Sequence, residues 1–219
     1  MPDMSLTVLE EYIETGNHQD LNLLLSKNPD LLKESTSHEI SPLLLACYYN
    51  KTQIVQVMLK YLSSITIHEA CAAGLSEQVR FMLEQKPDVI NEVSSHGFYP
   101  IGIAAHFGQE EIVRMLLRSH ANPNAASKNG YQVYPIHAAL SAQQDNIVKM
   151  LIEAGAEVNV VQSSRITPMH LAAQQGNIDL IIILLEHGAD ISVRNEFGQT
   201  ASDLAAEKGF HDIAEILKS

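Results

Sequence analysis

Three histidines are the first residues of this sequence whose type and regular placement would suit chemistry. They occupy the fourth position of three similar segments, Ile65-Thr66-Ile67-His68, Tyr134-Pro135-Ile136-His137 and Thr167-Pro168-Met169-His170. Imidazole nitrogens bind zinc and transfer protons near neutral pH, so a metal site or an acid–base site is the first hypothesis to examine.

The sequence around the histidines does not support a metal site. His38-Glu39 and His68-Glu69 resemble the start of a zinc-protease helix, but Pro42 and Ala72 stand where such a helix needs its second imidazole. No Cys-x-x-Cys pair is present. The nucleophile elbow and the glycine-rich phosphate-binding patterns are absent as well. We therefore predict no catalytic residue, no metal and no cofactor.

The last histidine segment opens a stretch, residues 167–176, that recurs in degraded form along the chain. With Gly176 as the anchor, the equivalent positions are Gly16, Asn50, Gly74, Gly108, Gln143, Gly176 and Gly209. Successive anchors are 34, 24, 34, 35, 33 and 33 residues apart. A period in this range indicates an array of repeated structural units.

These anchors, together with the Thr167-Pro168-Met169-His170 and Gly188-Ala189-Asp190 motifs, make the chain resemble the ankyrin repeat family over essentially its whole length. The resemblance implies an all-α solenoid of stacked helix-turn-helix units, with projecting turns or short β-hairpins between them. We expect one domain, residues 1–219, with repeats at approximately 5–33, 38–62, 63–92, 96–125, 129–160, 163–193 and 195–219.

Some repeats depart from the pattern. The first and the last carry many polar residues and are predicted to be caps with one face in water. The 24-residue spacing between Asn50 and Gly74 predicts that the projecting turn is missing between repeats two and three. Repeat five has two more residues between Gly130 and Pro135 than repeat four has between Gly97 and Pro100, which predicts a longer, bulged turn.

Within a repeat, the Thr-Pro pair is expected to start the first helix, as at Thr167 and Pro168. Proline needs no N–H partner there, and threonine supplies a capping oxygen. Tyr99 and Tyr134 replace this threonine, which costs about 1 kcal/mol at each site. The resemblance further implies that His68, His137 and His170 hydrogen-bond to backbone across repeats, and that Asn124 and Asn159 bridge successive turns.

The two cysteines occupy positions where small side chains let neighbouring helices approach closely. Cys47 and Cys71 are the second residues of the small pairs in adjacent repeats. We expect both to be buried and free, because equivalent positions of stacked repeats lie about 10 Å apart, too far for a disulfide. Reduced thiols are typical of the cytosol.

Charge narrows the choice of partner. The chain has 219 residues and a formal net charge of −12 at pH 7. Phosphate backbones and anionic lipid would repel it, so neither nucleic acid nor a membrane is an expected partner. The longest apolar run, Leu180 to Leu185, is far shorter than the roughly 18 residues of a membrane span. No signal peptide is visible, and a cytoplasmic or, in a eukaryote, nuclear location is expected.

The aromatic residues point to a binding surface. The chain holds seven Tyr, five Phe and no Trp, and half of these fall where an ankyrin array forms its concave face. The predicted partner-binding residues are Tyr48, Tyr49, His96, Phe98, His106, Phe107, Tyr131, Ile166 and Phe197. Aromatic anchors on a polar surface are typical of protein-binding hot spots. Packing between neighbouring turns is the competing interpretation, above all for Phe98 and Tyr131.

Three functions stay open at this stage. The first is a non-catalytic, monomeric protein–protein interaction module or scaffold that binds another protein or an extended peptide on its concave face. The second is an acidic inhibitor or immunity-type regulator of a basic enzyme or toxin, motivated by the net charge of −12. The third is a small-ligand or enzymatic role in the gap left by the missing turn. Steep salt sensitivity of a complex would favour the second function over the first.

Overall fold

The helices of this protein follow one another in pairs along the chain. A computed structural model describes residues 4–218, and this part contains fourteen α-helices, three short 3-10 segments and no β-strand. The all-α fold expected from the sequence is therefore confirmed. The chain divides into two compact units at Leu75. No helix in the described part is both long enough and apolar enough to cross a bilayer.

The first unit has an apolar core of its own. Its elements are α1 (Met4–Thr15), α2 (His18–Lys27), η1 (Pro29–Lys33), α3 (Pro42–Tyr48), α4 (Thr52–Leu59) and α5 (Ile67–Ala72). Leu9 and Ile13 of α1 share one fully buried cluster with Leu21 and Leu25 of α2, at the spacing of a helix face. The connection between α4 and α5 consists of residues 60–66 alone.

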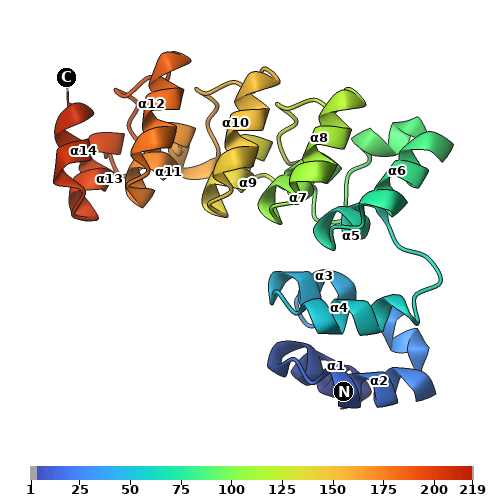
Figure 1. Ribbon diagram of the computed structural model, residues 1–219. Helices are drawn as coiled ribbons and strands as arrows, with labels where there is room; N and C mark the ends of the chain where they lie inside the picture. Colours follow the sequence, from blue (N-terminus) through green and yellow to red (C-terminus); the bar gives the residue numbers. More distant parts are fainter. Residues whose placement is uncertain (1–3, 219) are drawn as a thin grey trace. The chain divides into compact units, whose positions relative to one another are not determined.

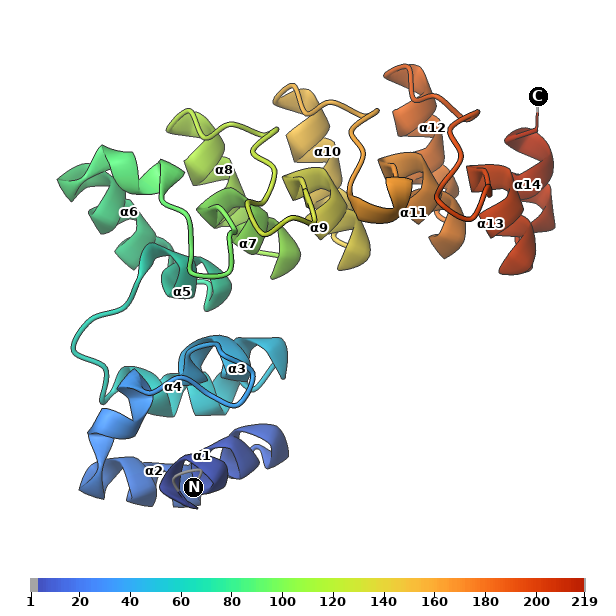
Figure 2. The same ribbon diagram turned by 180° about the vertical axis from the view of Figure 1, so that it is seen from behind.

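The second unit arranges its helices in two rows. Its elements are α6 (Ser76–Gln85), η2 (Pro87–Asn91), α7 (Pro100–His106), α8 (Glu110–Arg118), α9 (Pro135–Ser141), α10 (Asp145–Glu153), η3 (Ser163–Arg165), α11 (Pro168–Gln175), α12 (Ile178–Glu186), α13 (Ala201–Glu207) and α14 (His211–Ile216). Figures 1 and 2 show α7, α9, α11 and α13 side by side in one row, and α8, α10 and α12 in the other. Small side chains keep the first row tight, because Ala105, Ala139 and Ala173 are fully buried.

Three helices, α5, α11 and α13, begin at a threonine that supplies a capping oxygen. Thr66, Thr167 and Thr200 each accept a hydrogen bond from the backbone N–H three residues later, and the side chain at that later position bonds back to the threonine N–H. Tyr99 and Tyr134 make no such side-chain bond at the starts of α7 and α9. The expected loss of two caps is therefore confirmed.

The repeat anchors lie where the first helix of each pair ends. The backbone is left-handed at all seven anchors, with φ between 53° and 85°. Five anchors are glycine, but Asn50 (φ 53°) and Gln143 (φ 57°) adopt the same conformation with a side chain present. A Cβ in this region costs about 1–2 kcal/mol, so the rest of the fold offsets this cost at these two positions.

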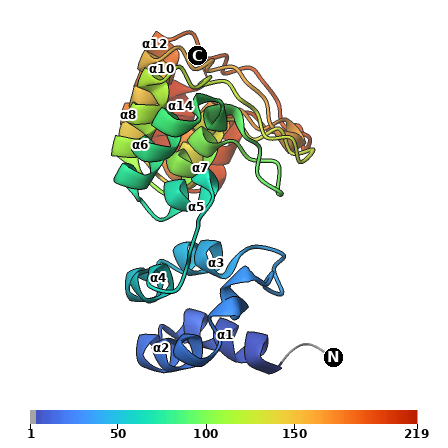
Figure 3. The same ribbon diagram turned by 90° about the vertical axis from the view of Figure 1, so that its right-hand side faces the viewer.

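Long connections project to one side of the second unit, and we call them fingers (Figure 3). Each finger joins the second helix of one pair to the first helix of the next. Their tips are residues 94–98, 127–133, 162–166 and 194–199. The second tip contains the longer turn predicted between Gly130 and Pro135, with Gln132 at φ 52°.

Consecutive finger tips are joined by backbone hydrogen bonds. The N–H of Lys128 donates to the carbonyl of Gly97 (2.7 Å), and the N–H of Ser163 donates to that of Tyr131 (2.9 Å). The N–H of Glu196 continues the row by donating to the carbonyl of Ser164 (3.0 Å). The four tips therefore form one continuous surface, which we call the finger row.

Two asparagines connect the fingers again near their bases. Asn124 Nδ2 donates to the carbonyl of Gly155 (3.0 Å), while its Oδ1 accepts from the N–H of Glu157 (2.8 Å). Asn159 makes the equivalent pair of bonds to Gly188 O (2.9 Å) and Asp190 N (2.8 Å). These contacts confirm the bridging role expected of both asparagines.

Substitution of Gly97 by alanine should destabilise the protein more than the same change at Gly130. Both residues have left-handed φ (81° and 84°), so each new Cβ costs about 1 kcal/mol. A Cβ on Gly97 would also lie 2.7 Å from Asn129 N, whereas one on Gly130 would meet nothing within 4 Å. Urea unfolding should show a loss of about 2 kcal/mol or more for Gly97→Ala and about 1 kcal/mol for Gly130→Ala. Equal losses would contradict close stacking of these tips.

Candidate functional site

The buried histidines of the second unit hold the fingers in place. His170 Nε2 donates to the carbonyl of Gln199 in the next finger (3.2 Å), and its Nδ1 lies 2.7 Å from Thr167 Oγ1. His137 Nε2 donates to the carbonyl of Ile166 in the same manner (3.1 Å). Each imidazole thus ties the start of one helix to the finger that follows. His68 is buried on α5 of the first unit.

His137 differs from His170 in one contact. Within residues 4–218, His137 Nδ1 is the buried side-chain polar atom that has no hydrogen-bond partner. The reason is local, because Tyr134 occupies the position from which Thr167 reaches His170 Nδ1. Burial lowers the pKa of His137 to about 4, although its bond to the Ile166 carbonyl acts in the opposite direction. The imidazole is therefore neutral near pH 7.

The side chains that most often bind metal ions are dispersed over the described part of the chain. There, no three His, Cys, Asp or Glu side chains come together as a metal ligand set would. Both thiols are free, with Cys71 buried and Cys47 only partly so, which differs from the expected burial of both. Burial raises the pKa of each thiol to about 12, with the charge of Glu69 contributing at Cys47. Protonated thiols are poor nucleophiles.

In the first unit, the two predicted tyrosines lie at the end of α3. Tyr48 is 54% exposed and Tyr49 39%. The Tyr49 hydroxyl donates to Glu14 Oε1 (3.0 Å), and this bond is the largest of the causes that raise the pKa of Tyr49. Both rings line a shallow depression with His38 and Ile40. This small apolar surface belongs to the first unit alone.

In the second unit, the finger row brings together several of the predicted residues. His96, Phe98 and Tyr131 line one open depression across the first two tips, together with Lys128. Tyr131 is 63% exposed, whereas His96 and Phe98 are half-buried. Phe197, in the last tip, is 80% exposed. Tyr131 and Phe197 therefore present the most open aromatic surface among the predicted residues.

The other predicted residues of this unit have different surroundings. His106 and Phe107, at the end of α7, stack edge to face with ring centroids 5.0 Å apart, and both are half-buried. Burial lowers the pKa of His106, while a bond to the Ala138 backbone acts in the opposite direction. Ile166 is half-buried, and its carbonyl is the acceptor for His137. These three contribute less open surface than Tyr131 and Phe197.

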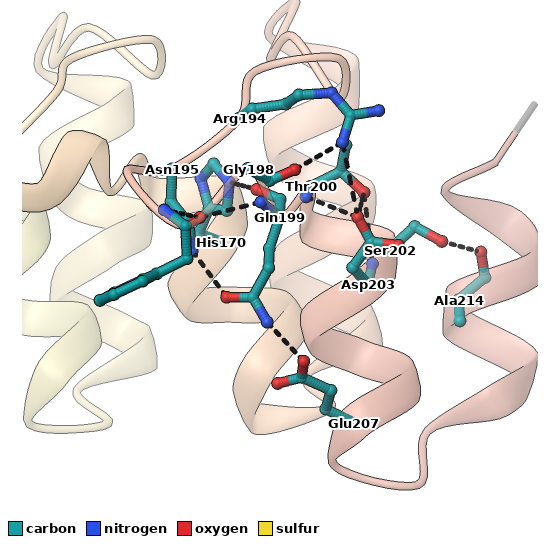
Figure 4. Close-up of polar contacts among 11 residues, drawn as sticks. His170, Arg194, Asn195, Gly198, Gln199, Thr200, Ser202, Asp203, Glu207 and Ala214 are labelled. Carbon is teal, nitrogen blue, oxygen red and sulfur yellow. Dashed lines mark hydrogen bonds and ion pairs between the residues drawn. The ribbon is translucent and has the colours of Figure 1, made fainter.

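The backbone beneath both exposed aromatic residues is held by an asparagine two positions earlier. Asn129 Oδ1 accepts from the N–H of Tyr131 (3.2 Å), and Asn195 Oδ1 accepts from the N–H of Phe197 (3.0 Å). Figure 4 shows how Asn195 also bonds to Gln199, whose side chain reaches Glu207 of α13. A fixed backbone lowers the entropy lost when these side chains are covered.

Sequence reasoning missed three basic residues in the finger row. Lys128 and Arg165 are exposed, and Arg194 donates to the Gly198 carbonyl (2.5 Å) and lies 3.9 Å from Asp203 (Figure 4). They stand at different positions within their repeats, so an alignment of repeats gives them no common signal. The backbone bonds between the tips bring them into one row.

Comparison with known proteins adds an independent result. A family model described as ankyrin repeats (3 copies) matches residues 67–162 and also residues 136–219, which together exceed two thirds of the chain. The chain is also similar to the human DNA-binding protein RFXANK, with 34% identity over 67 residues. That similarity covers 31% of this chain and 26% of the human protein.

Threonine at position 134 should stabilise the protein more than threonine at position 99. Tyr134→Thr restores a cap for α9 and a hydroxyl partner for His137 Nδ1, while Tyr99→Thr restores only a cap, because Gly102 stands at the histidine position. We expect Tyr134→Thr to unfold at higher urea, with an advantage over Tyr99→Thr of about 1 kcal/mol. Equal free energies of unfolding for the two variants would mean that the unpaired His137 Nδ1 does not destabilise the protein.

Acidification should destabilise the protein through His137. Its folded pKa, about 4, lies below the ordinary value of 6.5, so the unfolded chain binds a proton first as the pH falls. The stabilisation is present above pH 6.5 and is lost as the pH falls towards 4. This single residue should account for about 3 kcal/mol. The measurement is the free energy of unfolding across this range for the wild type and His137→Gln. Parallel curves would exclude the effect.

Proposed function

The chain belongs to the ankyrin repeat family, and we propose that it is a non-catalytic module that binds another protein or an extended peptide through the finger row of its second unit. Ankyrin repeats are generally interaction modules rather than enzymes. Because an array of this kind is a scaffold, its specificity resides in the side chains that it displays.

The observation that carries the proposal is the display of Tyr131 and Phe197 on a fixed backbone. Both rings are more than half exposed, at 63% and 80%, although large apolar side chains gain free energy when they leave water. Their N–H groups are already bonded to Asn129 and Asn195. Rigid aromatic anchors of this kind supply most of the binding energy in many protein interfaces.

Three further groups of predicted residues add surface that a partner would contact in this proposal. His96 and Phe98 extend the apolar surface beside Tyr131 in the same depression. His106, Phe107 and Ile166 add half-buried surface to the same unit. Tyr48 and Tyr49 offer a separate contact area on the first unit.

An acidic regulator that covers a basic enzyme or toxin is the second candidate. The net charge of −12 supports it, and exposed carboxylates such as Glu77, Glu84 and Glu153 lie on α6 and α10. The contact surface of such a regulator would then lie on helices such as α6 and α10 and not on the finger row. Strong weakening of a complex by salt, with no effect of finger substitutions, would favour this candidate.

Direct binding to nucleic acid receives less support. The human relative is a DNA-binding protein by name, but the similarity covers only about a quarter of it. The net charge of −12 opposes the approach of a phosphate backbone.

Removal of the two exposed rings should weaken binding without unfolding the protein. Peptides selected from a random-sequence phage library on the wild type should bind Tyr131→Ala/Phe197→Ala at least about ten-fold more weakly in calorimetry, because apolar contact is lost. Phe81→Ala is the matched control, since Phe81 on α6 is 62% exposed but lies outside the fingers.

The proposal fails in either of two cases. The library yields no peptide that binds the wild type, or the selected peptides bind the double variant as tightly as the wild type. Circular dichroism of both variants should match the wild type, and a loss of binding then reports on the surface and not on unfolding.

A further inference from the structure

The finger row has the opposite charge balance to the chain that carries it. The whole chain has a net charge of −12, yet the four tips contain three basic residues, Lys128, Arg165 and Arg194, and one acidic residue, Glu196. The tips are thus a small cationic area on an acidic protein.

Two of these cations are not neutralised by a neighbouring carboxylate. Among the described residues, Arg194 forms an ion pair with Asp203, but no carboxylate lies within ion-pair distance of Lys128 or Arg165. Lys128 Nζ lies 5.6 Å from the centroid of the Tyr99 ring, and Arg165 Nε donates to the carbonyl of Arg194 (3.1 Å). Both contacts orient the side chain and leave its charge unpaired.

The backbone places these cations next to the exposed rings. Lys128 and Tyr131 share a tip and line the same depression. The carbonyl of Tyr131 bonds to Ser163, which lies two residues before Arg165. Arg165 in turn contacts the backbone of Arg194, three residues before Phe197. Cationic and aromatic side chains are therefore interspersed across three fingers.

We propose that the finger row binds an extended acidic peptide segment in which carboxylates are interspersed with apolar side chains. This inference rests on the binding function proposed above and names its partner class. Guanidinium and ammonium groups pair with carboxylates, and Arg165 retains further N–H donors for such a bond. Leucine or phenylalanine side chains of the segment would cover Tyr131 and Phe197.

A single-stranded nucleic acid is the other ligand that uses cations and aromatic rings together. Its charge is far denser, with one phosphate for every base, and the surrounding net charge of −12 opposes it along its whole length. Glu196 also lies within the row and is exposed, so its carboxylate adds to this repulsion. A peptide with separated carboxylates meets less of this repulsion, so the row suits the peptide better.

Fluorescence anisotropy with defined probes tests the inference. The probes are a labelled dodecapeptide of repeated Asp-Glu-Leu-Phe, the same peptide with Lys and Arg for its acids, and an oligothymidylate of equal length. An extended dodecapeptide reaches about 40 Å, enough to follow several tips. We expect the acidic peptide to bind at least about ten-fold more tightly than the other probes.

Charge-reversed variants locate the effect. Lys128→Glu/Arg165→Glu should weaken binding of the acidic peptide about ten-fold or more. Arg114→Glu/Arg118→Glu, on exposed positions of α8, changes the net charge equally and should leave the affinity close to that of the wild type. Equal weakening by both pairs would show general repulsion and overturn the site.

The remaining outcomes separate this inference from the proposed function. Tighter binding of the basic peptide or of the oligonucleotide overturns the acidic partner class. If library-selected peptides depend on Tyr131 and Phe197 but not on Lys128 and Arg165, the fingers bind protein and the charge inference alone fails. If those peptides depend on neither pair, both proposals fail.

Discussion

A hydrogen bond from a buried imidazole to the backbone of the following finger is the contact on which the second unit depends. His137 and His170 donate to the carbonyls of Ile166 and Gln199, so the start of one helix fixes the path of the next finger. The fingers then meet through their own backbone bonds, in which the N–H groups of Lys128 and Ser163 donate to the carbonyls of Gly97 and Tyr131. The positions of the finger tips are therefore fixed by the stacked helices to which the imidazoles tie them.

The turns of the fold were predictable from sequence because each repeat must end its first helix with a residue in the same left-handed conformation. Spacing alone placed anchors at Asn50 and Gln143, and both have the left-handed backbone that glycine adopts at the other anchors. Helix starts were equally predictable, including the missing caps at Tyr99 and Tyr134. Such features depend on a few neighbouring residues, which a sequence shows directly.

The candidate site was less predictable, since it depends on contacts between repeats. Phe98 and Tyr131 look alike in the sequence, but one is half-buried and the other is open to water. The three basic residues of the row occupy different positions within their repeats, and the bonds between tips make them neighbours. They are Lys128, Arg165 and Arg194. The partial exposure of Cys47 was missed for the same reason. Distances between side chains of different repeats depend on how the repeats stack, which the sequence of a single repeat does not show.

The asparagine turns beneath Tyr131 and Phe197 fix the backbone without using the two aromatic side chains. Asn129 and Asn195 hold the backbone through atoms that every amino acid except proline possesses. The side chains at positions 131 and 197 are therefore free to diverge among descendants while the turn persists. In the binding mode proposed for the finger row, substitutions at these two positions would change the partner that is bound and leave the helices and their packing unchanged.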